Sequence, residues 1–145
     1  MQPDMEQDSI TRVECARGID AVVLATSTDA SDDAVASWAG SRRVPCFRGE
    51  LDNVAGRKLA AMQWIGVDAA VRVNADSPLL SPNLVDQGVA LFRENEVDIV
   101  TNVAPRTYPK GQSVEVVRAT ALERVLQTCV ADAPAASPQS AFQAD

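Results

Sequence analysis

Short apolar stretches rich in β-branched residues alternate with helical patterns along most of this chain, and this alternation constrains the fold more than any other feature. Strands are predicted at residues 19–26, 44–47, 71–73, 97–101 and 114–117, and helices at residues 31–40, 54–65, 82–92 and 119–128. Ser31 is expected to cap the first helix, which Gly40 ends, and Ser81 the third, with Pro82 in its first position. Strands separated by helices indicate an α/β fold with a three-layer, mainly parallel sheet and right-handed crossovers.

Length and charge limit the function. A chain of 145 residues with 46% hydrophobic residues is long enough for one globular domain with a core. Its formal net charge of −7 argues against a nucleic-acid partner, because phosphate neutralisation needs clustered lysine and arginine. No apolar run is long enough to span a membrane, the start of the chain is acidic rather than signal-like, and the cysteines are widely spaced, which favours reduced thiols. We therefore expect a cytoplasmic protein with no membrane partner.

The absence of histidine limits the chemistry further. It excludes a Cys/His zinc site, a Ser-His-Asp triad and a histidine general base, and leaves a hard-cation site made of oxygens. Asp76 follows the strand at residues 71–73 directly. Ligands of open parallel sheets bind outside the carboxyl ends of the strands, so this carboxylate is placed to reach a metal or a phosphate-bearing ligand. The alternative is a plain turn in which the Asp76 side chain bonds to its own backbone.

Two segments carry a resemblance to one enzyme family. Residues 74–82 read N-A-D-S-P-L-L-S-P, and residues 101–116 read T-N-V-A-P-R-T-Y-P-K-G-Q-S-V-E-V. With the F-R-G at residues 47–49, they resemble the cytidylyltransferases that include spore coat polysaccharide biosynthesis protein F, related to the CMP-KDO and CMP-sialic acid synthetases. The resemblance implies a nucleotide-diphospho-sugar transferase-like (Rossmann-like) fold. It also implies transfer of CMP from CTP to a sugar, with release of pyrophosphate, in polysaccharide precursor biosynthesis.

The resemblance implies roles for individual residues. Asp76 matches the acidic residue that helps to hold Mg²⁺ on the nucleotide phosphates, and it is the expected catalytic residue. Nucleotide or substrate contacts are expected from Arg57, Arg72, Asn74, Ser77 and Arg106. The alternatives are a solvated helix charge for Arg57, a carboxylate partner within the fold for Arg72, and a loop merely shaped by prolines for Arg106. Glu115 is a second candidate metal ligand, although an outward-facing strand residue is the commoner outcome at such a position.

The chain departs from the family's pattern in several places. Ser113 stands where the family usually has an aspartate, and Asn53 where an aspartate is more common. No counterpart of the family's first strand, or of its glycine-, arginine- and lysine-bearing triphosphate loop, precedes residue 10. We therefore expect a partial nucleotidyltransferase domain at residues 1–130 that lacks the first strand, followed by a disordered tail at residues 131–145.

Two hypotheses about function follow. The first is a cytidylyltransferase-like domain with CTP, a sugar and Mg²⁺ as its ligands, and with a homodimer as a further expectation. The second is a truncated, non-catalytic remnant, a sugar- or nucleotide-binding module of the same fold that cannot hold a triphosphate. The missing phosphate loop separates the two, and it leads us to expect no pyrophosphate release by this chain alone.

Overall fold

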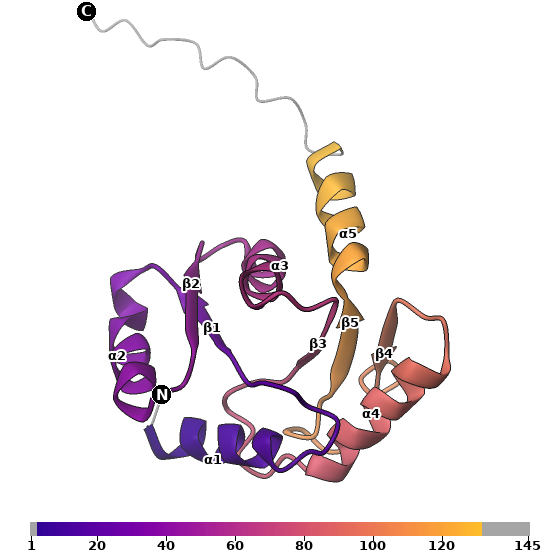
Figure 1. Cartoon of the computed structure of the whole chain (residues 1–145), viewed down its shortest axis with the longest axis horizontal. Coiled ribbons are helices and arrows are strands. Elements are labelled where there is room, and N and C mark those ends of the chain that lie inside the picture. The colour runs from indigo at the N-terminus through magenta and orange to yellow at the C-terminus, as the bar shows by residue number, and fades with distance from the viewer. Residues whose placement is uncertain (1–2, 132–145) are drawn as a thin grey trace, which may run out of the picture.

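The computed structural model describes residues 3–131, and the side chains of residues 7–128, as an alternation of helices and strands (Figure 1). The helices are α1 (Pro3–Glu14), α2 (Asp33–Arg42), α3 (Val54–Ile65), α4 (Pro82–Glu94) and α5 (Ala119–Ala131). The strands are β1 (Leu24–Ser27), β2 (Cys46–Gly49), β3 (Ala69–Arg72), β4 (Ile99–Thr101) and β5 (Glu115–Arg118). A single 3₁₀ turn, η1 (Ala30–Asp32), precedes α2. The predicted α/β class is confirmed.

The strands form two hydrogen-bonded groups. β1 and β2 pair in parallel, with Leu24 opposite Cys46 and Ser27 opposite Gly49. β5 lies between β3 and β4 and is antiparallel to both, so β3 and β4 run in the same direction. β5 reverses direction because a loop, residues 102–114, joins it to β4 in place of a crossover helix. Within residues 3–131, β1 and β3 do not pair with each other.

The hydrophobic core lies between α4 and the β3-β5-β4 group, beside the end of α1 (Figure 1). Its buried side chains are Val13, Ala16, Leu80, Val85, Val89, Phe92, Val114 and Val116. α4 approaches β5 closely at Gly88, where a Cβ atom would lie 3.3 Å from side-chain atoms of both Val114 and Val116. The absence of a side chain at Gly88 therefore allows the helix to pack against this strand.

α1 is a helix that the sequence analysis did not predict. Residues 3–14 are mostly polar, so they carry only a weak pattern of apolar spacing. The helix is held by distant contacts instead: Val13 is buried in the core, and Ala16 follows it there. Ser9 is also buried, and its Oγ donates to the carbonyl oxygen of Ala75 at 2.8 Å. Tertiary packing thus supplies the stability that local sequence does not.

The boundaries of α2 differ from the prediction. Ser31 does not cap this helix; it lies in η1, where its N–H donates to the Asp29 carboxylate at 2.8 Å. Gly40 does not end the helix, which continues for two more residues and closes at Arg43 in the left-handed conformation, with φ of 59°. Asp29, two residues before Ser31, is the stronger local acceptor. Its side chain caps the 3₁₀ turn η1, so the first turn begins earlier in the chain than predicted.

α3 and α4 begin as predicted. The Asn53 side chain caps α3 by accepting from the Gly56 N–H at 2.8 Å, and Gly66 ends the helix with φ of 72°. A Cβ atom at Gly56 would lie 2.5 Å from Asn53 Nδ2, so a larger residue there would displace the capping side chain from its present position. α4 starts at Pro82 after Ser81, as the sequence indicates, but the Ser81 side chain makes no capping hydrogen bond.

Other expectations are decided only in part. β1 begins at Leu24, later than the strand predicted from residue 19. None of the described helices is long and apolar enough to cross a membrane. Cys15 and Cys46 are free thiols. The predicted disordered tail lies, apart from Ala131, outside the described residues.

Candidate functional site

Asp76 lies in a tight turn just after β3. The turn is held by its neighbours: Ser9 Oγ donates to the Ala75 carbonyl oxygen at 2.8 Å, and the Leu80 N–H donates to the Ser77 carbonyl oxygen at 3.0 Å. Ser77 itself is buried. Asp76 is exposed, and its carboxylate makes no hydrogen bond or ion pair with any residue that the structure describes. The structure therefore shows the turn of the alternative interpretation but not its bond from the Asp76 carboxylate to the backbone, and the carboxylate is available to a ligand.

The loop between β4 and β5 is joined to this turn by Gln112. Gln112 Nε2 donates to the Leu79 carbonyl oxygen at 2.6 Å, and Gln112 Oε1 accepts from the Ser81 N–H at 3.0 Å. Asn102 holds the same loop from within: its Nδ2 donates to the Gln112 carbonyl oxygen at 2.7 Å, and its Oδ1 accepts from the Val114 N–H at 2.9 Å. Gln112 and Asn102 were not predicted as site residues, because polar side chains are common at the ends of loops and do not by themselves indicate a functional site.

Arg106 is exposed on this same loop. Its Nη1 donates to Ser113 Oγ at 3.1 Å, and its backbone forms a bridge with Val103. A guanidinium has five N–H donors, so most of them stay available for a substrate. Ser113, one of the departures from the family pattern, is thus a neutral partner of Arg106 at a position where an aspartate would pair with it.

Arg72 and Glu115 form an ion pair across β3 and β5, where they are register partners. Arg72 Nη2 also lies 3.4 Å from Asn74 Oδ1. Of the two partners considered for Arg72, the structure therefore shows the carboxylate of the fold. The Arg72 side chain is 42% exposed, so this ion pair lies at the surface rather than in the core. The contacts of Arg72 and Asn74 with a nucleotide stay predictions.

The residues expected to hold Mg²⁺ differ in how well they suit it. No three aspartate, glutamate, cysteine or histidine side chains gather into a metal site within the part of the chain that the structure describes. Mg²⁺, however, is usually held by one or two carboxylates together with nucleotide phosphates. Asp76 fits that requirement because it is exposed and unpaired. Glu115 fits it less well because Arg72 already occupies one of its oxygens.

Arg57 holds the loop that follows β2. Its Nη1 donates to the carbonyl oxygens of Glu50 and Leu51, at 2.6 and 3.0 Å. Its aliphatic stem lies against Gly49, where a Cβ atom would be 3.0 Å from Arg57 Cγ. The alternative of a plain solvated helix charge is therefore wrong, and a contact between Arg57 and a nucleotide stays a prediction.

Asp32 shapes the carboxyl end of β1. Its Oδ2 accepts from the Ser27 N–H and from Thr26 Oγ1, both at 2.8 Å. The hydrogen bonds from Ser27, followed by that from Thr26, lower the pKa of Asp32 to about 2. Arg48 holds the other side of this strand end, because its Nε donates to the Ser27 carbonyl oxygen at 2.7 Å. Its guanidinium also pairs with Asp33 at 2.7 Å.

Lys58 is a cation of α3 that the sequence analysis did not single out. Its side chain is half-buried, and burial, followed by the charge of Arg72, lowers its pKa; Glu115 opposes this shift and Arg57 adds to it. Lys58 has no ion pair or hydrogen bond from its side chain among the described residues. The only sequence signal was its place beside Arg57.

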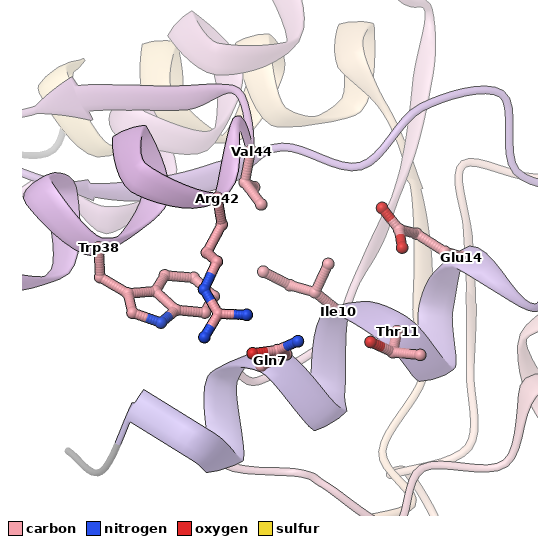
Figure 2. Close-up of a pocket in the computed structure, with 7 residues that line it drawn as sticks. All are labelled: Gln7, Ile10, Thr11, Glu14, Trp38, Arg42 and Val44. Atoms are coloured by element: carbon pink, nitrogen blue, oxygen red, sulfur yellow. The ribbon is translucent and has the colours of Figure 1, made fainter.

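A cavity of about 190 Å³ lies elsewhere, between α1 and the end of α2 (Figure 2). It is lined by Gln7, Ile10, Thr11, Glu14, Trp38, Arg42 and Val44. No predicted site residue is among them, and ligand pockets commonly measure about 300–1,000 Å³. Nε1 of Trp38 is buried without a hydrogen-bond partner in the described part of the chain. Of the predicted site residues, Asp76, Ser77 and Arg106 lie instead in the two segments that Gln112 joins.

Known proteins resemble this chain in sequence and in fold. The profile of a family described as Cytidylyltransferase matches residues 7–133. An uncharacterized protein of Methanocaldococcus jannaschii is 30% identical over 115 residues, which make up 79% of this chain and 46% of that protein. The structure of a cytidylyltransferase from Leptospira borgpetersenii serovar Hardjo-bovis superposes with a TM-score of 0.81 at 27% identity, over 86% of this chain and 53% of that one.

A more distant structure shares the fold alone. CMP:2-keto-3-deoxy-manno-octonic acid synthetase, in complex with CTP, superposes with a TM-score of 0.66 at 14% identity, over 85% of this chain and 66% of that one. The nucleotide-diphospho-sugar transferase-like fold is confirmed by these likenesses. The chain spans about half the length of the M. jannaschii and Leptospira proteins.

Proposed function

The chain belongs to the cytidylyltransferase family, and we propose that it contributes to the transfer of CMP from CTP to a sugar, with release of pyrophosphate, in the synthesis of polysaccharide precursors. The observation that carries the proposal is the exposed, unpaired carboxylate of Asp76, in a turn that Gln112 ties to the loop of Arg106. An oxygen-rich, histidine-free site suits a reaction in which charge neutralisation matters more than proton transfer.

In this reaction an oxygen of the sugar forms a bond with the α-phosphorus of CTP, and the bond to the leaving pyrophosphate breaks. Mg²⁺, when bound, neutralises charge on the phosphate oxygens, and Asp76 is the residue that would hold it. Arg106, with most of its donors unused, would contact the substrate. Arg57 already fixes the loop after β2 and would contribute positive charge beside the nucleotide.

A second candidate is a non-catalytic module of the same fold that binds a sugar or a nucleotide. It is favoured by one observation: β1 and β3, which do not pair with each other, leave the described strands in two groups rather than one sheet. Such a module would bind CTP or a sugar without releasing pyrophosphate.

The test compares the full chain with Asp76→Asn and with Asp20→Asn, a control at another exposed aspartate. Calorimetry with CTP in the presence of Mg²⁺ should show at least a tenfold loss of affinity for Asp76→Asn and none for the control. Equal Mg²⁺-dependent affinity in all three proteins would refute the role of Asp76. A parallel assay of pyrophosphate release with candidate sugars separates the two functions, because the binding module would bind without turnover.

A further inference from the structure

The cavity between α1 and α2 is lined by one face of each helix. Every third or fourth residue of α1 from Gln7 to Glu14 lies along one face and borders it, and Trp38 and Arg42, one turn apart on α2, border it from the other side (Figure 2). Its volume of about 190 Å³ is well above the roughly 10–15 Å³ that one water molecule needs. The cavity therefore has room for a molecule larger than water and smaller than a nucleotide.

Three polar groups that line this cavity have no partner among the side chains that the structure describes. Nε1 of Trp38 is buried and makes no hydrogen bond there. Arg42 and Glu14 carry opposite charges, yet neither forms a hydrogen bond or an ion pair with the other or with another described residue. A buried indole N–H usually has an acceptor, because an unsatisfied donor loses its hydration without compensation. The fold leaves this donor without an acceptor, and a ligand in the cavity would supply one.

The polar groups are divided between the two ends of the cavity. Figure 2 shows Trp38, Arg42 and Gln7 at one end and Glu14 at the other, with Ile10 between them. An indole N–H and a guanidinium can only donate, so the first end calls for an acceptor, and the charge of Arg42 favours an anionic one. The ionised carboxylate of Glu14 only accepts, so the other end favours a cationic donor.

We propose that this cavity binds a small amino acid, whose carboxylate accepts from Arg42 and from the Trp38 indole and whose ammonium group donates to Glu14. A molecule with one negative and one positive end matches the two lining charges better than a simple anion or a simple amine does. Figure 2 shows the Arg42 guanidinium in front of the indole ring, so the ligand reaches the N–H group when this unpaired side chain moves aside. The site goes beyond the proposed function, because none of its lining residues belongs to the segments of Asp76 and Arg106.

The indole N–H gives a direct readout, because the chain contains only two tryptophans, Trp38 and Trp64. In ¹⁵N–¹H correlation spectra each gives one indole signal, and Trp64→Phe, at an exposed position, identifies the signal of Trp38. The full chain is titrated with L-valine and δ-aminovalerate, and then with valerate and pentylamine, which each carry only one of the two charges. The Trp38 signal is expected to move and saturate with at least one of the amino acids, at an affinity at least tenfold higher than with either single-charge analogue.

Variants give an independent readout by calorimetry. Arg42→Met and Glu14→Gln should each lower the affinity for the same amino acid at least tenfold. Arg12→Met and Asp8→Asn remove the same charges at exposed positions of α1 that do not line the cavity, and they should change the affinity by less than twofold. Because Arg42 and Glu14 have no partner among the described residues, the urea midpoints of their variants should stay close to that of the unaltered protein. A loss of binding would then not be a loss of folding.

Three results would overturn the proposal. If neither amino acid moves the Trp38 signal, the cavity holds water only. If valerate binds as tightly as the amino acids and Glu14→Gln binds them normally, the cavity takes a simple carboxylate and the amino acid is refuted. If the signal moves but Arg42→Met and Glu14→Gln bind like their controls, the ligand lies elsewhere. No nucleotide enters these experiments, so their failure leaves the proposed transfer of CMP untouched.

Discussion

Asp32 is expected to stabilise the end of β1 by a pH-dependent amount. In Asp32→Asn the side-chain oxygen still accepts hydrogen bonds, but the two bonds from Ser27 and Thr26 lose the charge that strengthens them. A hydrogen bond to a charged group contributes about 1.5–3 kcal/mol and a neutral one about 0.5–1.5 kcal/mol. Since Asp32 is partly exposed, water screens part of this difference, and the expected loss over both bonds is about 1–2 kcal/mol.

Asp32→Ala should cost more, because Ser27 is fully buried and its N–H would lose its acceptor. A buried donor without a partner costs about 1–3 kcal/mol. The free energy of unfolding should therefore be highest for the unaltered protein, lower for Asp32→Asn and lowest for Asp32→Ala. Asp20→Asn, at an exposed position, is the control for the loss of one negative charge.

The pH dependence gives the sharper test. The pKa of Asp32 is about 2 in the folded protein, against an ordinary value of 3.8. The stabilisation is fully present above about pH 5 and is lost as the pH falls through the range between these two values, because the unfolded chain takes up the proton first. Urea unfolding at a series of pH values, followed by tryptophan fluorescence, should show the gap between the unaltered protein and Asp32→Asn closing as the pH falls toward about 2. A gap that is unchanged at low pH, or no larger than that of Asp20→Asn, would refute the reasoning.

Three further predictions concern packing and the departure from the family pattern. Gly88→Ala should lower the free energy of unfolding by about 1–2 kcal/mol, because its Cβ would press on two valines of the core at 3.3 Å. Gly40→Ala should raise the free energy of unfolding by about 0.5–1 kcal/mol, because nothing lies within 4 Å of a Cβ atom at this position. If the urea midpoints of Gly88→Ala and Gly40→Ala both moved in the same direction, these two predictions would be contradicted. Ser113→Asp should strengthen Mg²⁺-dependent CTP binding severalfold by restoring a carboxylate beside Arg106, and an unchanged affinity in calorimetry would mean that Ser113 has only a structural role.

The helices that were predicted well are those whose ends depend on neighbours in the sequence. Asn53 and Gly66 limit α3, and Ser81 with Pro82 starts α4; in each case capping or backbone geometry acts over a few residues. The position of Asp76 after β3 also follows from a local pattern, the end of an apolar strand, whereas its role as a metal ligand stays a prediction. The alternation of strand and helix patterns indicated the α/β class, and the family resemblance supplied what local patterns could not, namely the nucleotide-diphospho-sugar transferase-like fold.

The features that were missed depend on residues far apart in the chain. α1 is fixed by the bond between Ser9 and Ala75, which are 66 residues apart, and nothing within α1 itself signals that partner. The partner of Arg72 lies 43 residues away on β5, so the sequence could only indicate that one was needed. The binding of Mg²⁺, the homodimeric state and the cytoplasmic location stay predictions.

The two bonds of the Gln112 side chain have a consequence for how a ligand is received. Because they cross from one loop to the start of α4, neither the turn of Asp76 nor the loop of Arg106 can open without breaking bonds of the other. The two segments therefore open as one cooperative unit. The conformational entropy of bringing the two segments together is lost when the chain folds rather than when a ligand arrives, so a ligand that contacted both segments would not have to order them.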